Sequence, residues 1–385
     1  MRTIRNLVDK IKPTFAKGGK LGFLESTFDA FETFLFVPNT TTRRGAHIRD
    51  CNDMKRTMIM VVVALMPALL FGMYNVGYQH FLSQDIVPEF WASFWFGFLK
   101  VLPMIAVSYV VGLGIEFGFA QVRGHEVNEG FLVTGLLIPM IMPVDIPLWI
   151  LGLSTAFAVV FGKEVFGGTG MNVFNPALVA RVFAFLAYTP SMSGTKVWIA
   201  GMTSGEGVVD GFSGATPLEN LVTTGQMGYS PLDAFLGFIP GSVGETSTVA
   251  ILLGAVVLLF TGIASWRTMF SVFVGGLAMA LVFNVCGSSA YAQIPGWYHL
   301  IIGGFAFGAV FMATDPVTSA QTATGQYIVG FLIGVLAVLT RVVNPAYPEG
   351  MMLAILFMNA MAPLVVYYVV ESSIKRRNKR IKTEK

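Results

Sequence analysis

Residues 57–78 read TMIMVVVALMPALLFGMYNVGY, a stretch without a charged side chain. A transmembrane α-helix needs about 20 consecutive apolar residues to cross the hydrocarbon core of a bilayer, so this stretch predicts a membrane span. Comparable apolar runs follow at 102–122, 131–142, 148–162, 176–188, 249–264, 269–286, 300–313, 327–343 and 351–370. We therefore predict an all-α integral membrane protein with about ten transmembrane helices. Neighbouring segments such as 165–175 would complete the shorter runs as broken or re-entrant helices.

The composition of the chain agrees with a membrane protein and excludes a soluble enzyme. Hydrophobic residues make up 54% of the 385 residues and charged residues 12%, whereas soluble domains contain about 25% charged residues. A soluble fold has no means of hiding that much apolar surface from water, but a bilayer accepts it as outward-facing surface. The 42 glycines suit the close approach of helices in lipid.

The predicted spans divide into two five-helix halves, residues 57–188 and 249–371, on either side of a long loop at 189–248. Because each half has an odd number of spans, the halves are expected to run in opposite directions, as in inverted-repeat transporters. A short internal similarity supports the repeat. The sequence Asn-Pro-Ala opens the last span of each half, at 175–177 and again at 344–346.

The charge distribution predicts the orientation in the membrane. Eleven of the 25 Lys and Arg residues lie in the N-terminal segment 1–56, and seven lie in the tail 372–385. The positive-inside rule then places both termini in the cytoplasm of a bacterial cell, with the spans in its inner membrane. Membrane-flanking charge explains these basic clusters better than nucleic-acid binding. The loop 189–248 has one basic residue, Lys196, against five acidic ones, which indicates a periplasmic location.

Cysteine and histidine provide no metal or haem motif. Cys51 and Cys286 are far apart, so this chain alone does not supply the ligands of an iron–sulfur cluster. None of the four histidines has metal-ligand spacing, and no metal site is predicted. His299 follows Trp297 and Tyr298, which is typical of an aromatic belt at the membrane interface.

One segment of the periplasmic loop is a candidate modification site. Residues 210–217 read DGFSGATP, in which the small residues Ser213, Gly214 and Ala215 precede Thr216. A modifying enzyme needs unhindered access to its acceptor hydroxyl, and these residues predict an exposed hydroxyl at Thr216. Pro217 discourages a regular strand. By composition alone, an ordinary Gly/Ser turn is the alternative interpretation.

The pattern D-x-x-S-G-A-T resembles the flavin acceptor motif of the NqrB/RnfD family. These are membrane subunits of the Na⁺-translocating NADH:quinone oxidoreductase and of the related Rnf electron-transport complex. The resemblance covers nearly the whole chain and includes HEVNEGF at 125–131, KEVFGGTG at 163–170, GFIPGS at 237–242, FMATDP at 311–316 and RVVNPAYPEGMM at 341–352. The long N-terminal segment is similar to the NqrB branch rather than to RnfD.

The resemblance implies the function. It implies FMN esterified through its phosphate to Thr216 by a flavin transferase, with Asp210, Ser213, Gly214 and Ala215 as further cofactor-binding residues. It also implies a non-covalent riboflavin, five other subunits, and electron transfer from a partner's flavin to a quinone, coupled to Na⁺ translocation. NADH oxidation would occur on another subunit, and no dinucleotide-binding G-x-G-x-x-G follows a strand here.

Two acidic residues within apolar sequence are candidates for the Na⁺ path. Glu116 lies in the second predicted span and Asp315 closes the eighth. A carboxylate in the membrane is costly and suggests a function, and hard cations prefer oxygen ligands. The alternatives are a snorkelling side chain for Glu116 and a helix-end cap for Asp315. Lys163 and Glu164 are expected to form a local ion pair, and Arg181 is expected to pair with one of these acids.

The quinone region is predicted from two neighbouring segments. Phe23 and Phe28 belong to an amphipathic stretch at 21–35 that is expected to lie on the membrane or protein surface. Glu126 and Glu129 in an adjacent loop would supply protons to a quinone bound there, and a purely structural surface helix is the alternative. For the whole chain, an RnfD-type member of an Rnf electron-transport complex and a non-redox channel or transporter with about ten helices remain the alternative functions.

Overall fold

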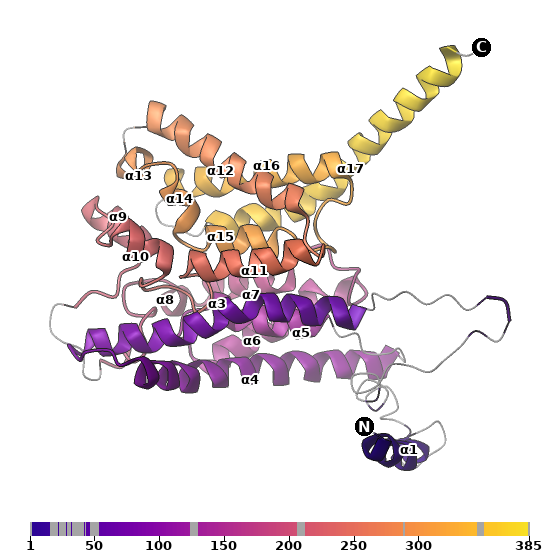
Figure 1. Ribbon diagram of the computed structural model, residues 1–385, viewed down its shortest axis with the longest axis horizontal. Coiled ribbons are helices and arrows are strands. Elements are labelled where there is room, and N and C mark those ends of the chain that lie inside the picture. Colours follow the sequence, from indigo (N-terminus) through magenta and orange to yellow (C-terminus); the bar gives the residue numbers. More distant parts are fainter. Residues whose placement is uncertain are drawn as a thin grey trace.

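The computed structural model describes residues 2–15, 22, 28, 32, 42, 44–46, 54–123, 130–205, 212–287, 289–344 and 350–383. Over these residues the regular structure is helical and no strand is present, which confirms the all-α prediction. Helix α1 (Arg2–Phe15) stands apart from the helical body formed by the later helices (Figure 1).

The helices follow the predicted apolar runs. The first half contains α3 (Met54–Ser83), α4 (Phe90–Arg123), α5 (Phe131–Ile141), α6 (Leu148–Gly162), the 3₁₀ turn η2 (Glu164–Phe166) and α7 (Pro176–Ala187). The segment between the halves contains α8 (Thr189–Met192), α9 (Pro217–Thr224) and α10 (Pro231–Leu236). The second half contains α11 (Thr248–Phe260), α12 (Trp266–Cys286), α13 (Ala290–Gln293), α14 (Tyr298–Ile301), α15 (Phe305–Phe307), the π-helical η3 (Gly308–Met312), α16 (Ala323–Val343) and α17 (Gly350–Thr383).

Within the described part of the chain, six helices are long and apolar enough to cross a membrane, namely α3, α4, α6 with η2, α12, α16 and α17. The helices α5, α7 and α11 are apolar but shorter. These findings support a multi-pass membrane protein. The number of about ten spans stays a prediction.

The predicted span at 300–313 does not form one continuous helix. After α14 the backbone passes through Gly303 and Gly304, whose φ angles are +62° and +70°. A residue with a side chain rarely adopts this left-handed conformation, whereas glycine does so without a steric penalty. The segment therefore divides into α14, α15 and η3, and the break lies beside the cavity described below.

Small residues bring α3 and α4 into direct backbone contact. A Cβ atom added to Gly97 of α4 would lie 1.7 Å from the carbonyl oxygen of Met73 in α3. In the same way, a Cβ atom on Gly77 would lie 1.9 Å from the carbonyl oxygen of Ser93. The two contacts are one helical turn apart on each helix, a spacing that permits close packing of helices in lipid.

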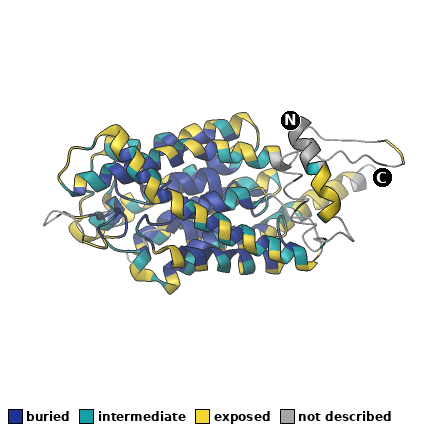
Figure 2. Ribbon diagram, turned by 90° about the horizontal axis from the view of Figure 1, so that it is seen from below, coloured by how far each residue is buried: buried dark blue, intermediate teal, exposed yellow. Residues whose placement is uncertain are grey.

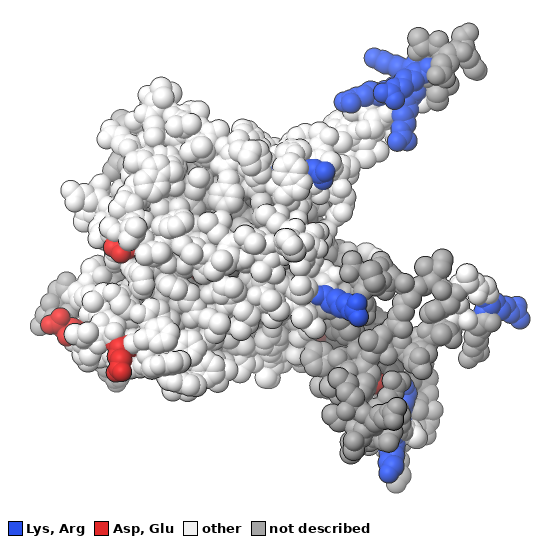
Figure 3. Space-filling view, in the orientation of Figure 1, with Lys and Arg blue, Asp and Glu red and all other residues white. Residues whose placement is uncertain are grey.

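The outer surface of the body is apolar. Large side chains such as Val110 (73% exposed) and Phe260 (94% exposed) point outward, and buried residues concentrate on the inner faces of the helices (Figure 2). On the face drawn in Figure 3, acidic residues lie at the end of the body that carries α9 and α10, and basic residues lie at the opposite end. An apolar belt between two charged ends is the surface expected of a protein embedded in a bilayer.

Candidate functional site

Thr216 is the N-cap of α9, at the end of the body that also carries α8 and α10 (Figure 1). Its Oγ1 accepts a hydrogen bond from the backbone N–H of Glu219 at 3.3 Å, and Pro217 occupies the first helical position. Thr-x-x-Glu with proline after the cap is a signal for a helix start. Residues 216–219 (TPLE) carry this signal, and the interpretation of the segment as a turn overlooked it.

The small residues before Thr216 serve close packing. A Cβ atom on Gly214 would lie 2.4 Å from the carbonyl oxygen of Thr195 and 2.8 Å from the sulfur of Met202. Ala215 is 3% exposed, and Thr216 itself is half-buried. The prediction of a freely exposed hydroxyl is therefore wrong, because the loop is packed against the segment 195–202.

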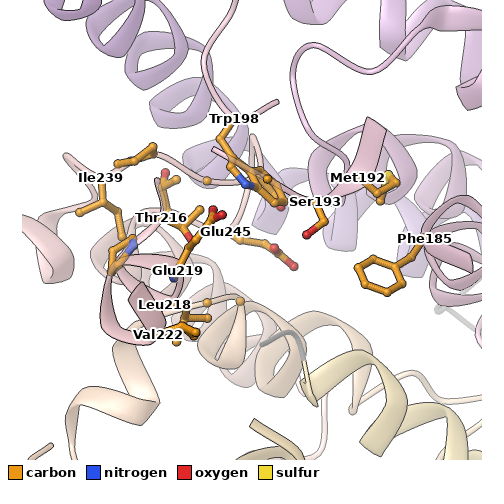
Figure 4. Close-up of a pocket in the computed structure, with 18 of the residues that line it drawn as sticks. Phe185, Met192, Ser193, Trp198, Thr216, Leu218, Glu219, Val222, Ile239 and Glu245 are labelled. Atoms are coloured by element: carbon orange, nitrogen blue, oxygen red, sulfur yellow. The ribbon is translucent and has the colours of Figure 1, made fainter. Parts of the chain in front are cut away.

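Thr216 borders a cavity of about 250 Å³. In Figure 4, Thr216, Glu219 and Trp198 lie on one side of the cavity, and Phe185 and Met192 lie on the other. The walls come from α7, α8, α9 and the loops around 193–198, 239–246 and 303–304. The lining residues include Phe185, Met192, Ser193, Trp198, Thr216, Glu219, Val222, Ile239, Ser242, Glu245, Gly303 and Gly304.

A buried ion pair forms part of the cavity wall. Arg181 of α7 donates from Nη1 to Glu245 Oε1 at 2.9 Å, and its Nη2 lies 3.4 Å from the hydroxyl of Ser242. The side chain of Arg181 is 4% exposed and that of Glu245 is 13% exposed. The expectation that Arg181 pairs with Glu116, Glu164 or Asp315 is thus wrong. An arginine inside an apolar run was a signal for a site, but the sequence could not identify its partner.

The loop that carries Trp198 is fixed by Asp145. The carboxylate of Asp145 accepts hydrogen bonds from the backbone N–H groups of Gly201 at 3.0 Å and Thr203 at 3.1 Å. The backbone N–H of Asp145 also donates to the carbonyl of Val197 at 3.3 Å. Asp145 therefore positions the indole of Trp198 at the cavity, although Asp145 does not line the cavity itself.

Arg341 of α16 holds the glycine break at the opposite wall. This fully buried side chain donates to the carbonyls of His299 at 2.9 Å, Ile302 at 3.2 Å and Gly303 at 3.0 Å. It thereby satisfies carbonyls that the end of α14 leaves without intrahelical partners. His299 is also fully buried, so its predicted place in an exposed interface belt beside Trp297 is wrong.

A second cavity of about 100 Å³ lies toward the opposite end of the body. Its polar lining consists of Thr57, Thr134, Lys163, Thr169, Asn172, Asn175, Thr314 and Asp315, together with apolar residues such as Leu258 and Phe311. The carboxylate of Asp315 accepts hydrogen bonds from the Asn175 amide at 3.3 Å, the Thr318 hydroxyl at 3.1 Å and the Val317 backbone at 3.0 Å. Asp315 thus faces a cavity as well as terminating η3.

Glu116 is buried and paired. Its carboxylate binds the ammonium of Lys163, which also lines the second cavity. Glu164 instead binds Arg123, with 3.3 Å between Oε2 and Nη1. The expected pairing of Lys163 with Glu164 is therefore wrong, because the turn after α6 directs these adjacent side chains to different partners on α4.

The remaining candidate residues are distributed as follows. Asp210, Phe23, Glu126 and Glu129 lie outside the described residues. Phe28 is described, and its ring stacks on that of Phe15 in α1 with centroids 4.8 Å apart. Ser213 is exposed, and its hydroxyl lies 3.4 Å from the backbone nitrogen of Ala215.

The carboxyl group of Glu219 is expected to make the stability of α9 depend on pH. Burial raises the pKa of Glu219 from 4.5, so the folded state binds this proton more tightly than the unfolded state does. The stabilisation is fully present below pH 4.5 and is lost as the pH rises through the higher folded-state pKa. Amide hydrogen exchange, corrected for intrinsic rates, should show α9 protection falling across that interval. Glu219→Gln should make the protection flat, and an unchanged slope in this variant would assign the effect to another group.

The sequence matches known proteins over almost its full length. Residues 41–375 match the profile of the NQR2, RnfD, RnfE family. The Na(+)-translocating NADH-quinone reductase subunit (NqrB) of Chromohalobacter salexigens is 47% identical over 404 residues, which cover 98% of this chain and 96% of that protein. The corresponding protein of Ectopseudomonas mendocina is 47% identical and that of Pseudomonas aeruginosa 46% identical, each with 97% of this chain and 98% of the relative covered.

These matches extend across both helical halves and the loop that carries Thr216. Identity of 46–47% over at least 97% of the chain is too extensive to result from one shared motif. It confirms the resemblance drawn from the separate sequence motifs. The chain therefore belongs to the NQR2, RnfD, RnfE family of membrane proteins.

Proposed function

We propose that this chain is the membrane flavoprotein subunit of a Na⁺-translocating NADH–quinone reductase. Its relatives are named as the NqrB component of that enzyme. In this role the chain receives electrons from the flavin of a partner protein and delivers them to a quinone. Electron transfer is coupled to Na⁺ translocation, while NADH is oxidised on another subunit.

The observation that carries this proposal is the position of Thr216. Its hydroxyl borders a cavity and caps the N-terminus of α9. Backbone N–H groups and the helix dipole at such a terminus favour a phosphate group. FMN esterified through its phosphate to Thr216 would therefore have its negative charge at a favourable position and its ring free to occupy the cavity.

The cavity offers suitable surfaces for a flavin ring. Trp198, Phe185 and Val222 supply aromatic and apolar contacts, and Ser242 and Glu245 supply polar groups. When bound, the flavin supplies reversible electron transfer, and the protein supplies its placement and electrostatic environment. The Arg181–Glu245 pair beside the cavity provides fixed charges that tune the flavin's electron affinity. Asp210, Ser213, Gly214 and Ala215 complete the acceptor segment.

The second cavity is our proposed location for the non-covalent riboflavin. The amides of Asn172 and Asn175 and the hydroxyls of Thr169 and Thr314 offer hydrogen bonds to ribityl hydroxyls and to the polar edge of the ring. Riboflavin has no phosphate, and this cavity is not at the capped start of α9.

Glu116 and Asp315 are proposed for the Na⁺ path, and Phe23, Phe28, Glu126 and Glu129 for the quinone region. The chain would function with five other subunits after maturation by a flavin transferase. We further propose about ten spans in two inverted halves, 57–188 and 249–371, in the bacterial inner membrane. The loop 189–248 would be periplasmic, and both the segment 1–56 and the tail 372–385 would be cytoplasmic.

The experiment is to purify the native complex, denature it in detergent and measure flavin fluorescence at the gel position of this chain. The peptide that contains Thr216 would then be weighed by mass spectrometry. A fluorescent band, with that peptide heavier by one FMN less one water, is the expected result. A dark band and an unmodified peptide, despite an active transferase, would favour a non-redox transporter. The co-purifying proteins would distinguish an Rnf-type complex.

A further inference from the structure

Two ion pairs join the C-terminal part of α4 to the end of α6. Lys163 binds Glu116, and each of these side chains is 4% exposed. Arg123 binds Glu164 beside them, and the Glu164 side chain is 5% exposed. Each of these two carboxylates therefore has its own cation, and the two pairs together are neutral.

Lys163 also borders the second cavity. Among the described residues that line this cavity, Lys163 and Asp315 are the two charged ones. The ammonium of Lys163 lies 5.8 Å from the centre of the Phe131 ring. Lysine carries its charge on a flexible four-carbon chain with three donors. Its ammonium can therefore turn from Glu116 toward the cavity by side-chain rotation alone.

The hydrogen bonds found for Asp315 all come from neutral donors, namely Asn175, Val317 and Thr318. The three carboxylates of Glu116, Glu164 and Asp315 thus face two cations, Lys163 and Arg123, within the described part of this region. One negative charge remains without a counter-charge. Because an uncompensated buried charge is strongly unfavourable, the region fits one monovalent cation. A divalent cation would leave an excess positive charge.

We propose that Glu116 and Asp315 are two alternative positions for one Na⁺ ion, and that Lys163 is a tethered cation that pairs with the carboxylate the ion does not occupy. When Lys163 is on Glu116, as in this structure, the ion binds at Asp315. When Lys163 turns to Asp315, the ion binds at Glu116. The net charge stays constant in both arrangements. The inference rests on the proposed Na⁺ transport and does not depend on the flavin at Thr216.

The test measures how Na⁺ stabilises the full-length chain in detergent. The midpoint of thermal unfolding would be compared in NaCl and in choline chloride at equal ionic strength. For the unmodified chain we expect a midpoint roughly 5 °C higher in NaCl, because an ion that binds only the folded state stabilises it. Glu116→Gln should abolish this difference, since Lys163 can then neutralise Asp315 permanently. Asp315→Asn should abolish it as well.

The Glu116→Gln variant separates the proposal from a simpler site. If Asp315 bound Na⁺ alone, Glu116→Gln would keep the full NaCl effect, and that result would overturn the exchange with Lys163. Should Glu116→Gln fail to give a monodisperse protein, Lys163→Gln decides. This variant keeps a hydrogen-bond donor for Glu116 but lacks the charge, so the NaCl effect should become at least roughly 1.5-fold larger. An unchanged effect contradicts the proposal, and Lys163→Arg serves as the charge-preserving control. Loss of covalent flavin would disprove the Thr216 assignment without altering these midpoints.

Discussion

Replacing Thr216 with alanine is expected to remove all covalent flavin from this chain while the helical body stays folded. The alanine has no hydroxyl to esterify, and Thr216 lies outside the long apolar helices. The remaining structural loss is one N-cap hydrogen bond, to the backbone of Glu219. Such a loss typically costs about 1 kcal/mol. Fluorescence at the gel position of the denatured chain should fall to background, with the elution volume in size-exclusion chromatography unchanged.

Two variants serve as controls for this result. Thr216→Ser keeps a hydroxyl that can both cap α9 and accept the phosphoester, so it should retain measurable fluorescence. Ser213→Ala removes an exposed hydroxyl in the same segment and should leave the flavin in place. Normal fluorescence in Thr216→Ala would mean that the flavin is attached elsewhere. Loss of fluorescence in Ser213→Ala alone would move the attachment to that residue.

Continuous apolar runs allowed accurate prediction of helices from the sequence. The run at 148–162 has the same ends as α6 (Leu148–Gly162), because an uninterrupted apolar segment in lipid must satisfy its backbone hydrogen bonds internally. The run at 300–313 carried the same signal and was misread. Its break at Gly303 is stabilised by Arg341, 38 residues further along the chain. A local pattern contains no information about that contact.

The candidate site was predictable only in part for a similar reason. Thr216 could be identified from its motif. The cavity that it borders combines Phe185, Trp198, Glu245 and Gly304, which the fold brings together from separate segments. The pairing of Lys163 was misjudged because adjacency in sequence suggested Glu164. The 3₁₀ turn after α6 sends Lys163 to Glu116 instead, 47 residues away in the sequence.

Gly97→Ala is expected to have the largest effect on stability, because it adds one methyl group where two helices meet. The new Cβ would lie 1.7 Å from the carbonyl oxygen of Met73 and 3.3 Å from the backbone nitrogen of Gly77. Backbone atoms have no rotamer that relieves such a clash, so α3 and α4 must separate. Overpacking of this kind costs about 3 kcal/mol, which should lower the thermal unfolding midpoint in detergent by roughly 5 °C or more.

Gly114→Ala is the matched control on the same helix. Gly114 also lies inside α4, but a Cβ atom added there would have no neighbour within 4 Å. Alanine favours a helix over glycine by up to about 1 kcal/mol, so the unfolding midpoint of this variant should stay the same or rise slightly. Equal losses in both variants would mean that any side chain at a glycine of α4 is harmful, whereas a loss in Gly97→Ala alone traces the effect to its contact with α3. That contact matters for function because α4 also carries Glu116, whose approach to Lys163 depends on how α4 is seated against the rest of the body.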